Sequence, residues 1–155
     1  MRTLPRLAAT AALTSIAAFG LTAPAGATPP QGVTADTLAE LELAPSLLPP
    51  PPPGHTAVPD ETEGTLRRLV IAPGGSTGWH RHGGHVQGLV VSGTLTRVLP
   101  DCSRVTSPAG AWVTEDPGGD HVGLNLGPDP VVLLVTYLLP DDVPFAEDAP
   151  ARCPA

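Results

Sequence analysis

The chain has 155 residues, with 8 basic side chains against 15 acidic ones and a formal charge of −7. This acidity argues against a general binder of nucleic acids or of membrane surfaces, because such a protein needs a basic face to release counterions. Glycine and proline occur 17 and 21 times, and both are costly inside helices. Since 41% of the residues are hydrophobic, there is material for one modest core. We therefore expect one small, turn-rich, all-β domain.

Residues 1–27 have the pattern of a secretory signal peptide. Arg2 and Arg6 make the start basic, residues 7–21 form an apolar run, and residues 25–27 (AGA) supply a cleavage site of small residues. A membrane anchor is the alternative, but the apolar run is shorter than the roughly 20 residues that span a bilayer. We expect a secreted (extracellular) protein that has no membrane association once the signal is removed.

The two cysteines, Cys102 and Cys153, could form a disulfide in an oxidising compartment. The bond would close a loop of about 50 residues, worth roughly 4 kcal/mol in the chain-entropy model. It would also hold the C-terminal tail against the rest of the domain. The alternative is two unpaired thiols, because a sequence does not show whether the sulfur atoms meet.

The mature chain divides into three predicted parts: a proline-rich segment at 28–60, a strand-rich domain at 61–140 and a C-terminal tail at 141–155. The proline run 49–53 should be an extended polyproline stretch, and residues 33–43 fit either a short helix or an edge strand. In the domain, short apolar runs alternate with glycine and proline turns. The expected strands are 65–72, 86–91, 94–99, 111–114, 121–126 and 131–139. Such even spacing indicates a sandwich or a barrel.

Three of the five histidines lie within six positions, at His80, His82 and His85. On a strand, His80 and His82 point to the same face, because side chains alternate. Two neutral ring nitrogens on one face can converge on a metal ion. About forty residues later, His121 begins another predicted strand, after a proline–glycine turn and before Asn125.

These motifs resemble those of the cupin superfamily over about residues 65–140. The first cupin motif is similar to Gly74, His80, His82 and Gly93, and the second to Pro117, Gly118, Gly119, His121 and Asn125. The resemblance implies a single-domain double-stranded β-helix, or jelly-roll barrel, as in small secreted bacterial cupins. It also implies a divalent transition metal (Fe, Mn, Zn, Ni or Cu) bound by His80, His82 and His121.

The sequence departs from the cupin pattern in two places. Val86 occupies the position where the family usually has a glutamate ligand, and the second motif is one residue shorter between its glycine and its histidine. Gln87 is a candidate fourth ligand if the strand carries a bulge, although strand alternation opposes it, and His85 is another. The expected centre is therefore three histidines with open positions. Without a carboxylate, the uncompensated charge of the ion should favour an anionic ligand.

Other residues have ordinary structural interpretations beside functional ones. Trp79 could line a pocket, although a core role is the default for both Trp79 and Trp112. Asn125 should mainly hold the strand near His121, with ligand contact as the alternative. The acidic residues that we interpret first as turn residues and only second as general bases are Glu115, Asp116 and Asp120. The candidates for binding a carboxylate or phosphate are Arg67, Arg68, Arg81 and Arg97.

The cupin resemblance does not name a function, because the superfamily includes dioxygenases, isomerases, sugar-binding modules, storage proteins and sensors. We favour a secreted protein that binds a divalent metal through three histidines, together with a small-molecule ligand. The alternatives are a mononuclear metal-dependent oxidoreductase, similar to cupin dioxygenases and acting on a small organic substrate, and a metal-free structural barrel. Whether the protein is an enzyme stays open, and a homodimer is compatible with the resemblance.

Overall fold

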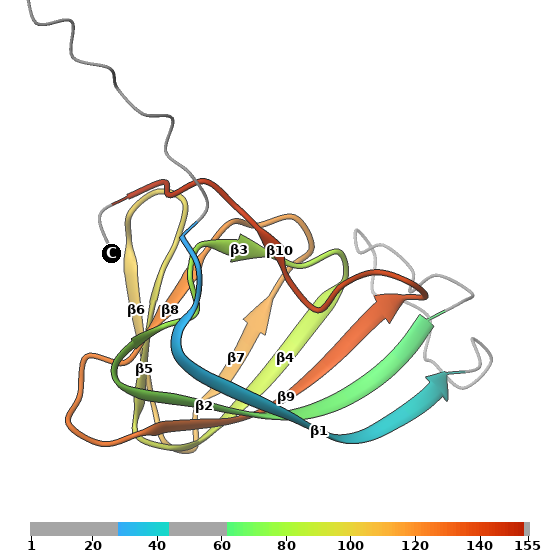
Figure 1. The fold of residues 1–155 in the computed structure, drawn as a ribbon, viewed down its shortest axis with the longest axis horizontal. Helices are drawn as coiled ribbons and strands as arrows, with labels where there is room; N and C mark the ends of the chain where they lie inside the picture. Colours follow the sequence, from blue (N-terminus) through green and yellow to red (C-terminus); the bar gives the residue numbers. More distant parts are fainter. Residues whose placement is uncertain (1–27, 44–61, 154–155) are drawn as a thin grey trace, which may run out of the picture.

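The computed structural model describes residues 28–43 and 62–153, which form strands and no helix (Figure 1). The strands are β1 (Gln31–Leu43), β2 (Thr62–Ser76), β3 (His80–Arg81), β4 (His85–Ser92), β5 (Thr94–Val98), β6 (Arg104–Pro108), β7 (Trp112–Glu115), β8 (Val122–Leu124), β9 (Val131–Pro140) and β10 (Glu147–Asp148). Eight of them form one curved sheet in the order β6-β5-β8-β2-β9-β4-β7, with β1 paired to β2. The sheet curls into a nearly closed barrel, and β3 and β10 pair across one end of it. This confirms the predicted all-β jelly roll.

The six strands expected between residues 65 and 139 are all present. Residues 33–43 belong to β1, so the edge-strand alternative is the correct one for this segment. β1 lies in the predicted proline-rich segment and extends the sheet of the barrel, while the domain boundaries at 60 and 140 stay predictions. The sequence did not predict β6, which is mostly exposed, or the two-residue strand β10. The strand expected at His80 and His82 is present as β3, which ends at Arg81. The predicted signal peptide and the proline run 49–53 lie outside the described residues.

Strand β9 shows how the sequence specifies the barrel. Its buried side chains alternate strictly with less buried ones, and the buried ones are Val131, Leu133, Val135, Tyr137 and Leu139. Because alternate side chains face opposite sides of a strand, one complete face of β9 enters the interior core. β9 pairs with β2 on one side and β4 on the other. β9 is therefore an inner strand of the sheet, paired along both of its edges.

Two glycines are required by the close turns around the barrel. Gly93, between β4 and β5, has φ 74°, and a Cβ there would lie 2.7 Å from the carbonyl oxygen of Pro130. Gly78, just before β3, has φ 72°, and a Cβ there would overlap the carbonyl oxygen of Thr28. Only glycine adopts such a backbone readily in so little space. Gly78 also lies two residues before His80, the first histidine of the His80–His82 pair, and turns the chain toward it.

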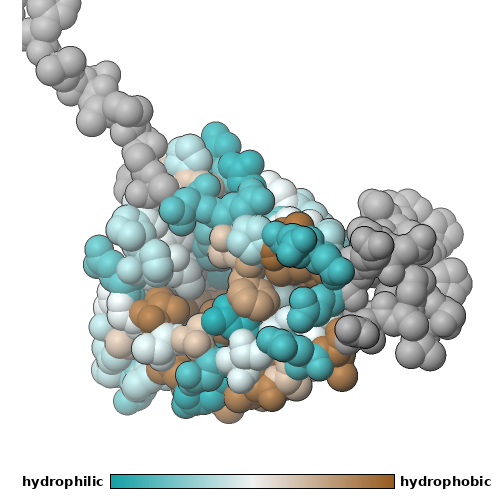
Figure 2. All heavy atoms as spheres, turned by 45° about the vertical axis from the view of Figure 1, so that its right-hand side comes forward, coloured by the Kyte–Doolittle hydropathy of each residue, from teal (hydrophilic) through white to brown (hydrophobic). Residues whose placement is uncertain are grey.

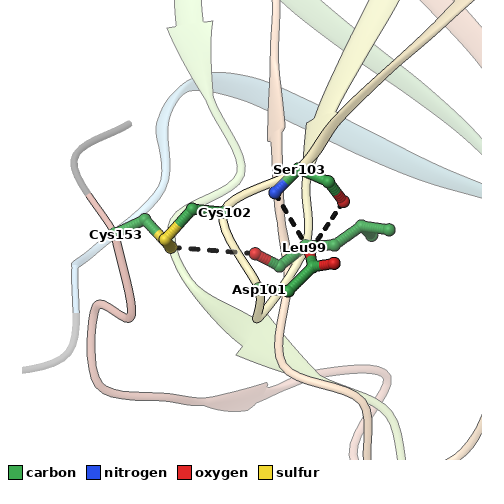
Figure 3. Close-up of a disulfide and its surroundings, with 5 residues drawn as sticks. All are labelled: Leu99, Asp101, Cys102, Ser103 and Cys153. Carbon is green, nitrogen blue, oxygen red and sulfur yellow. Dashed lines mark hydrogen bonds between the residues drawn. A yellow bond between two sulfur atoms is a disulfide. The ribbon is translucent and has the colours of Figure 1, made fainter.

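The predicted disulfide is present between Cys102 and Cys153, whose Cα atoms are 5.7 Å apart (Figure 3). Cys102 lies in the tight turn that joins β5 to β6. In this turn, Asp101 Oδ1 accepts hydrogen bonds from the backbone nitrogen and the hydroxyl of Ser103, at 3.0 and 2.6 Å. The bond attaches the end of the segment 141–153, which we call the C-terminal strap, to the barrel.

Among the described residues, the large apolar side chains that remain exposed are spread over several strands. They are Leu38 and Leu41 in β1, Val91 in β4, Val105 in β6, Trp112 in β7, and Leu126 after β8. Figure 2 shows one face on which apolar patches are separated by hydrophilic side chains. Trp112 is 70% exposed, so the default expectation of a core role for it is wrong.

Within the described ranges, no helix is long and apolar enough to cross a membrane.

Candidate metal centre

The three predicted histidines meet at the end of the barrel where β3 lies. His80 and His121 face each other across an antiparallel bridge, in which each backbone nitrogen donates to the other residue's carbonyl oxygen at 2.9 Å. His82 follows directly after β3. The ring centroids are 4.3 Å apart for His80 and His121, 4.8 Å for His80 and His82, and 5.2 Å for His82 and His121. Two distant stretches of chain thus place three imidazoles side by side.

Each of these rings is oriented by a backbone carbonyl. The Nδ1 atoms of His80 and His121 lie 2.9 Å from the carbonyl oxygens of Gly78 and Gly119, and Nδ1 of His82 is bonded to that of Phe145. A carbonyl oxygen only accepts, so each Nδ1 carries the proton and donates. In the neutral rings the lone pair is then on Nε2. The same outer hydrogen bond fixes ring and tautomer in protein metal sites.

A fourth side chain, Glu115 at the end of β7, joins the three histidines. Its Oε2 lies 3.1 Å from Nε2 of His82, and its Oε1 lies 3.2 Å from Nε2 of His121. One ligand atom from each of the four residues lies within 4.8 Å of all the others. Ligands about 2 Å from one ion are at most about 4 Å apart, so a small contraction would let all four bind the same ion.

Glu115 occupies a position that the sequence analysis interpreted as a turn. In the antiparallel pairing of β4 with β7, Glu115 is the direct partner of Val86, the residue that stands where the cupin pattern has its glutamate. Directly paired residues share a face of the sheet, so the carboxylate reaches the centre from the neighbouring strand. The sequence of β7 contained a signal for this position, because the apolar Val113, which is buried, is followed by the polar Thr114, which is exposed. This alternation turns Glu115 inward.

The two predicted candidates for a fourth ligand lie outside this group. Gln87 is exposed, because it alternates with the buried Val86 along β4. His85 is half-buried, and its Nδ1 lies 3.9 Å from a carboxylate oxygen of the exposed Asp116. The structure therefore places Glu115, and neither Gln87 nor His85, beside the three imidazoles.

Neither Trp79 nor Asn125 lines the two cavities at the centre that are described below. Trp79 is 1% exposed and packs in a second apolar cluster, because it faces away from the histidine that follows it. Asn125 is fully buried, and its amide nitrogen donates to the carbonyl oxygens of Ile71 and Asp129, both at 2.9 Å. Its Oδ1 accepts from the backbone nitrogen of Gly127 at 3.0 Å. The side chain of Asn125 is thus hydrogen-bonded to backbone groups of three other residues.

Comparison with known families agrees with the fold and the motifs. The family model described as "Cupin domain" matches residues 67–137, a range that contains all four residues of the group. Residues 67–137 therefore form a cupin domain. A comparison of this cupin with curated proteins found no match.

Solved structures similar to this cupin show the same fold. The polyketide cyclase RemF from Streptomyces resistomycificus is 18% identical, with a TM-score of 0.54 and coverage of 88% of this chain and 85% of that chain. The cupin domain of Schizosaccharomyces pombe Cnp3 is 10% identical, with a TM-score of 0.53 and coverage of 70% and 66%. At these identities the likeness concerns the fold alone.

The electrostatics of the cupin centre keep its carboxylate ionised. Burial opposes a charge on Glu115, but the contacts with His121 and His82 outweigh burial and hold the pKa of this carboxyl well below its ordinary value. Burial likewise opposes a charge on His121, yet the contact with Glu115 raises its pKa. Burial, assisted by the charge of His121, lowers the pKa of His80 to about 4. At neutral pH, His80 therefore presents a neutral nitrogen beside an ionised carboxylate.

Two cavities meet at the centre. The inner cavity, inside the barrel, has a volume of about 50 Å³ and is bounded by His80, His82 and a set of apolar side chains. The outer cavity has a volume of about 240 Å³. Arg97, Glu115 and His121 line both cavities. The candidate metal centre thus lies at the neck between an outer cavity and an apolar interior.

Of the four arginines proposed as anion binders, Arg97 is the one that reaches these cavities among the described residues. Its side chain is 13% exposed, and its Nη1 donates to the carbonyl oxygen of Thr114 at 3.0 Å and lies 3.5 Å from Oε1 of Glu115. The other three contact groups elsewhere: Arg67 the ring of Phe145, Arg68 the carboxylate of Asp36, and Arg81 that of Asp120.

Proposed function

We propose that this cupin binds one divalent transition metal ion through His80, His82, His121 and Glu115. The observation that supports the proposal is the direction of the hydrogen-bonding groups. All three Nδ1–H groups are used by backbone carbonyls, so in the neutral rings the atoms that face inward are three Nε2 lone pairs and a carboxylate. Buried acceptors that face one another are unfavourable without a cation or a proton between them. A divalent cation satisfies the whole set.

The donor set limits the kind of ion. Three imidazoles and one carboxylate suit iron, manganese, zinc, nickel or copper, because imidazole is a borderline ligand and the carboxylate a hard one. When bound, such an ion would supply a Lewis acid with positions left open for a small-molecule ligand. The chain itself supplies the orientation: the backbone carbonyls hold the three rings, and Glu115 offsets part of the charge of the ion.

Elemental analysis of protein purified without an affinity tag tests the proposal. We expect about one equivalent of metal in the wild type and loss of it in His121→Ala, because this change removes one of the four ligand atoms. The matched control is His85→Ala, which removes an imidazole outside the group and should retain the metal. A wild type that takes up no metal on reconstitution, or a His121→Ala variant with full metal content, would refute the assignment.

A mononuclear metal-dependent oxidoreductase is a second candidate function. It is favoured by the inner cavity beside the four residues, which gives a small organic substrate space at the centre. Oxygen consumption by iron-loaded protein, measured with small thiols, diols and diketones, tests this candidate. Consumption that depends on His121 would support it, and its absence with every substrate class would leave the binding function as the better description.

The disulfide supports an oxidising location, because such bonds persist outside the reducing cytosol. We propose that the protein is secreted after removal of residues 1–27. The mass of the protein recovered from culture medium tests this, since cleavage after residue 27 predicts a chain that begins at Thr28. An intact N-terminus, or recovery from the cytosol alone, would contradict it.

A further inference from the structure

We propose that the two cavities receive a short-chain aliphatic carboxylate, with its head at Arg97 and the metal and its tail in the inner cavity. The proposal rests on the proposed metal function, because the ion contributes part of the charge that would bind the head. It names a ligand class for the same centre. The argument has three parts: the unused edge of Arg97, the charge at the neck and the shape of the interior.

Arg97 has hydrogen-bonding capacity that the protein does not use. Its Nη1 is bonded to the carbonyl oxygen of Thr114, while its Nε is buried without a hydrogen-bond partner. A buried N–H without a partner costs free energy. A carboxylate matches the guanidinium fork through two parallel hydrogen bonds, and so can satisfy an edge that includes Nε. Arg97 lines both cavities, so a ligand that passes between them lies against its side chain.

The charge at the neck favours an anion. A divalent ion and the guanidinium of Arg97 together exceed the single negative charge of Glu115, so a neutral ligand would leave an excess of positive charge in a largely buried site. Asp120 also lines the outer cavity, but ion pairs with Arg81 at 3.0 Å and Arg152 at 2.7 Å compensate its charge. A monoanionic head therefore reduces the imbalance without meeting an unpaired buried carboxylate there.

The inner cavity is shaped for a small apolar tail. Its walls include Leu69, Val86, Leu95, Val113, Leu133 and Val135. One water needs about 10–15 Å³ of such volume, so the observed space of about 50 Å³ holds roughly three to five groups of that size. A chain of a few carbon atoms fills it, whereas a long fatty acyl chain exceeds it.

The first test is a titration of the zinc-loaded, disulfide-bonded protein with the straight-chain series from acetate to octanoate. Burial of each methylene should strengthen binding about fourfold until the cavity is full, after butyrate or valerate, and octanoate should bind more weakly than either. Straight-chain alcohols of equal length serve as the control without a charged head. They should bind at least tenfold more weakly, because they cannot pair with Arg97.

Two variants separate the head from the tail. Arg97→Gln should weaken butyrate at least tenfold, and Arg97→Lys should recover only part of this loss, because lysine keeps the charge and not the fork. Gly88→Ala adds a methyl group to the cavity wall, 3.6 Å from a methyl carbon of Val135, an ordinary contact. It should weaken butyrate more than acetate and leave zinc content unchanged. Gln87→Ala, on the exposed face of the same strand, is the matched control.

Zinc content is measured in every sample, which keeps the two proposals apart. A wild type without zinc would refute the metal function. A zinc-loaded wild type with no affinity for any carboxylate, or with equal affinity for the alcohols, would overturn the ligand assignment and leave the metal site standing. Butyrate binding that Gly88→Ala leaves unchanged would exclude the inner cavity as the site of the tail.

Discussion

Strand β1 and the C-terminal strap both lie outside residues 67–137, the range that matches the cupin family model. They differ in whether they contact the histidine–glutamate group. β1 pairs with β2 from Gln31 to Leu43, and none of its residues belongs to the histidine–glutamate group. The strap has only the two residues of β10 in a strand, yet it crosses the barrel end beside β3 (Figure 1). The difference shows that a few well-placed contacts, and not the extent of pairing, connect a segment to a site.

The strap reaches the centre through its backbone. Phe145 provides the carbonyl oxygen that is bonded to Nδ1 of His82, and Asp148 is the register partner of His80 in the pairing of β10 with β3. Beyond β10, the backbone nitrogen of Ala149 donates to the carbonyl oxygen of Trp79 at 2.9 Å. The disulfide at Cys153 then fixes the end. The strap therefore supports both histidines of the first motif.

Removal of the disulfide should have the largest effect and would test whether the strap needs its covalent attachment. We expect the double variant Cys102→Ser/Cys153→Ser to lose about 2–4 kcal/mol of unfolding free energy, because the unfolded chain is no longer constrained. Zinc affinity should fall in parallel, since the strap supports His80 and His82. Urea unfolding and zinc titration measure the two effects. Unchanged zinc affinity in a destabilised variant would separate the strap from the centre.

Phe145→Ala tests the strap at its contact with the centre. The Phe145 ring lies 5.0 Å from the ring of Tyr137 and 4.3 Å from the guanidinium carbon of Arg67. Because the side chain is only partly buried, its loss should cost about 2 kcal/mol, less than for a fully buried phenylalanine. The carbonyl that orients His82 should then be less well placed, and zinc affinity should fall about 10- to 100-fold. Leu41→Ala, an exposed truncation in β1, is the control and should retain wild-type affinity.

We predict that β1 affects the stability of the barrel and not the centre, and Gly32→Ala tests this prediction. Gly32 has φ 63°, while a Cβ there would make only ordinary contacts, the nearest at 3.4 Å from Cβ of Ala72. The left-handed backbone should make alanine cost about 1 kcal/mol of unfolding free energy. Zinc affinity should not change. A tenfold loss of zinc affinity, measured in the same titration, would show that β1 is coupled to the centre.

The smallest effect is expected for Asp36→Ala. The Asp36 carboxylate lies 4.0 Å from Arg68, and the two side chains are 68% and 45% exposed. Such exposed pairs contribute little, because water and salt screen them. Thermal unfolding should show a change below about 0.5 kcal/mol. A loss above 1 kcal/mol would mean that β1 depends on this ion pair.

The fold and the three histidines could be predicted because their signals are local. The alternation in β9 identifies a half-buried strand from consecutive residues, and the spacing of His80 and His82 places both on one face. The position of Trp79 follows the same rule, since a residue next to an inward histidine faces outward. The alternation rule could therefore have been applied to Trp79, but the interpretation of Trp79 as a pocket residue did not use it.

The rest of the centre depends on distant pairings. Glu115 reaches it only through the register that places it opposite Val86, and register is a property of two strands and not of one. The contribution of Phe145 to His82 comes from a backbone carbonyl. Every residue type has such a carbonyl, so no composition or motif could have indicated this contact.

The placement of Glu115 opposite Val86 has a consequence for how relatives of this protein are recognised. A search that requires an acidic residue between the second histidine and the following glycine would classify this chain as having lost its carboxylate. The carboxylate is instead placed across a sheet spacing of about 5 Å, so an acidic residue at either position can reach the three histidines. Related chains with an apolar residue at the first position deserve inspection of the strand beside it before their centres are judged to be degenerate.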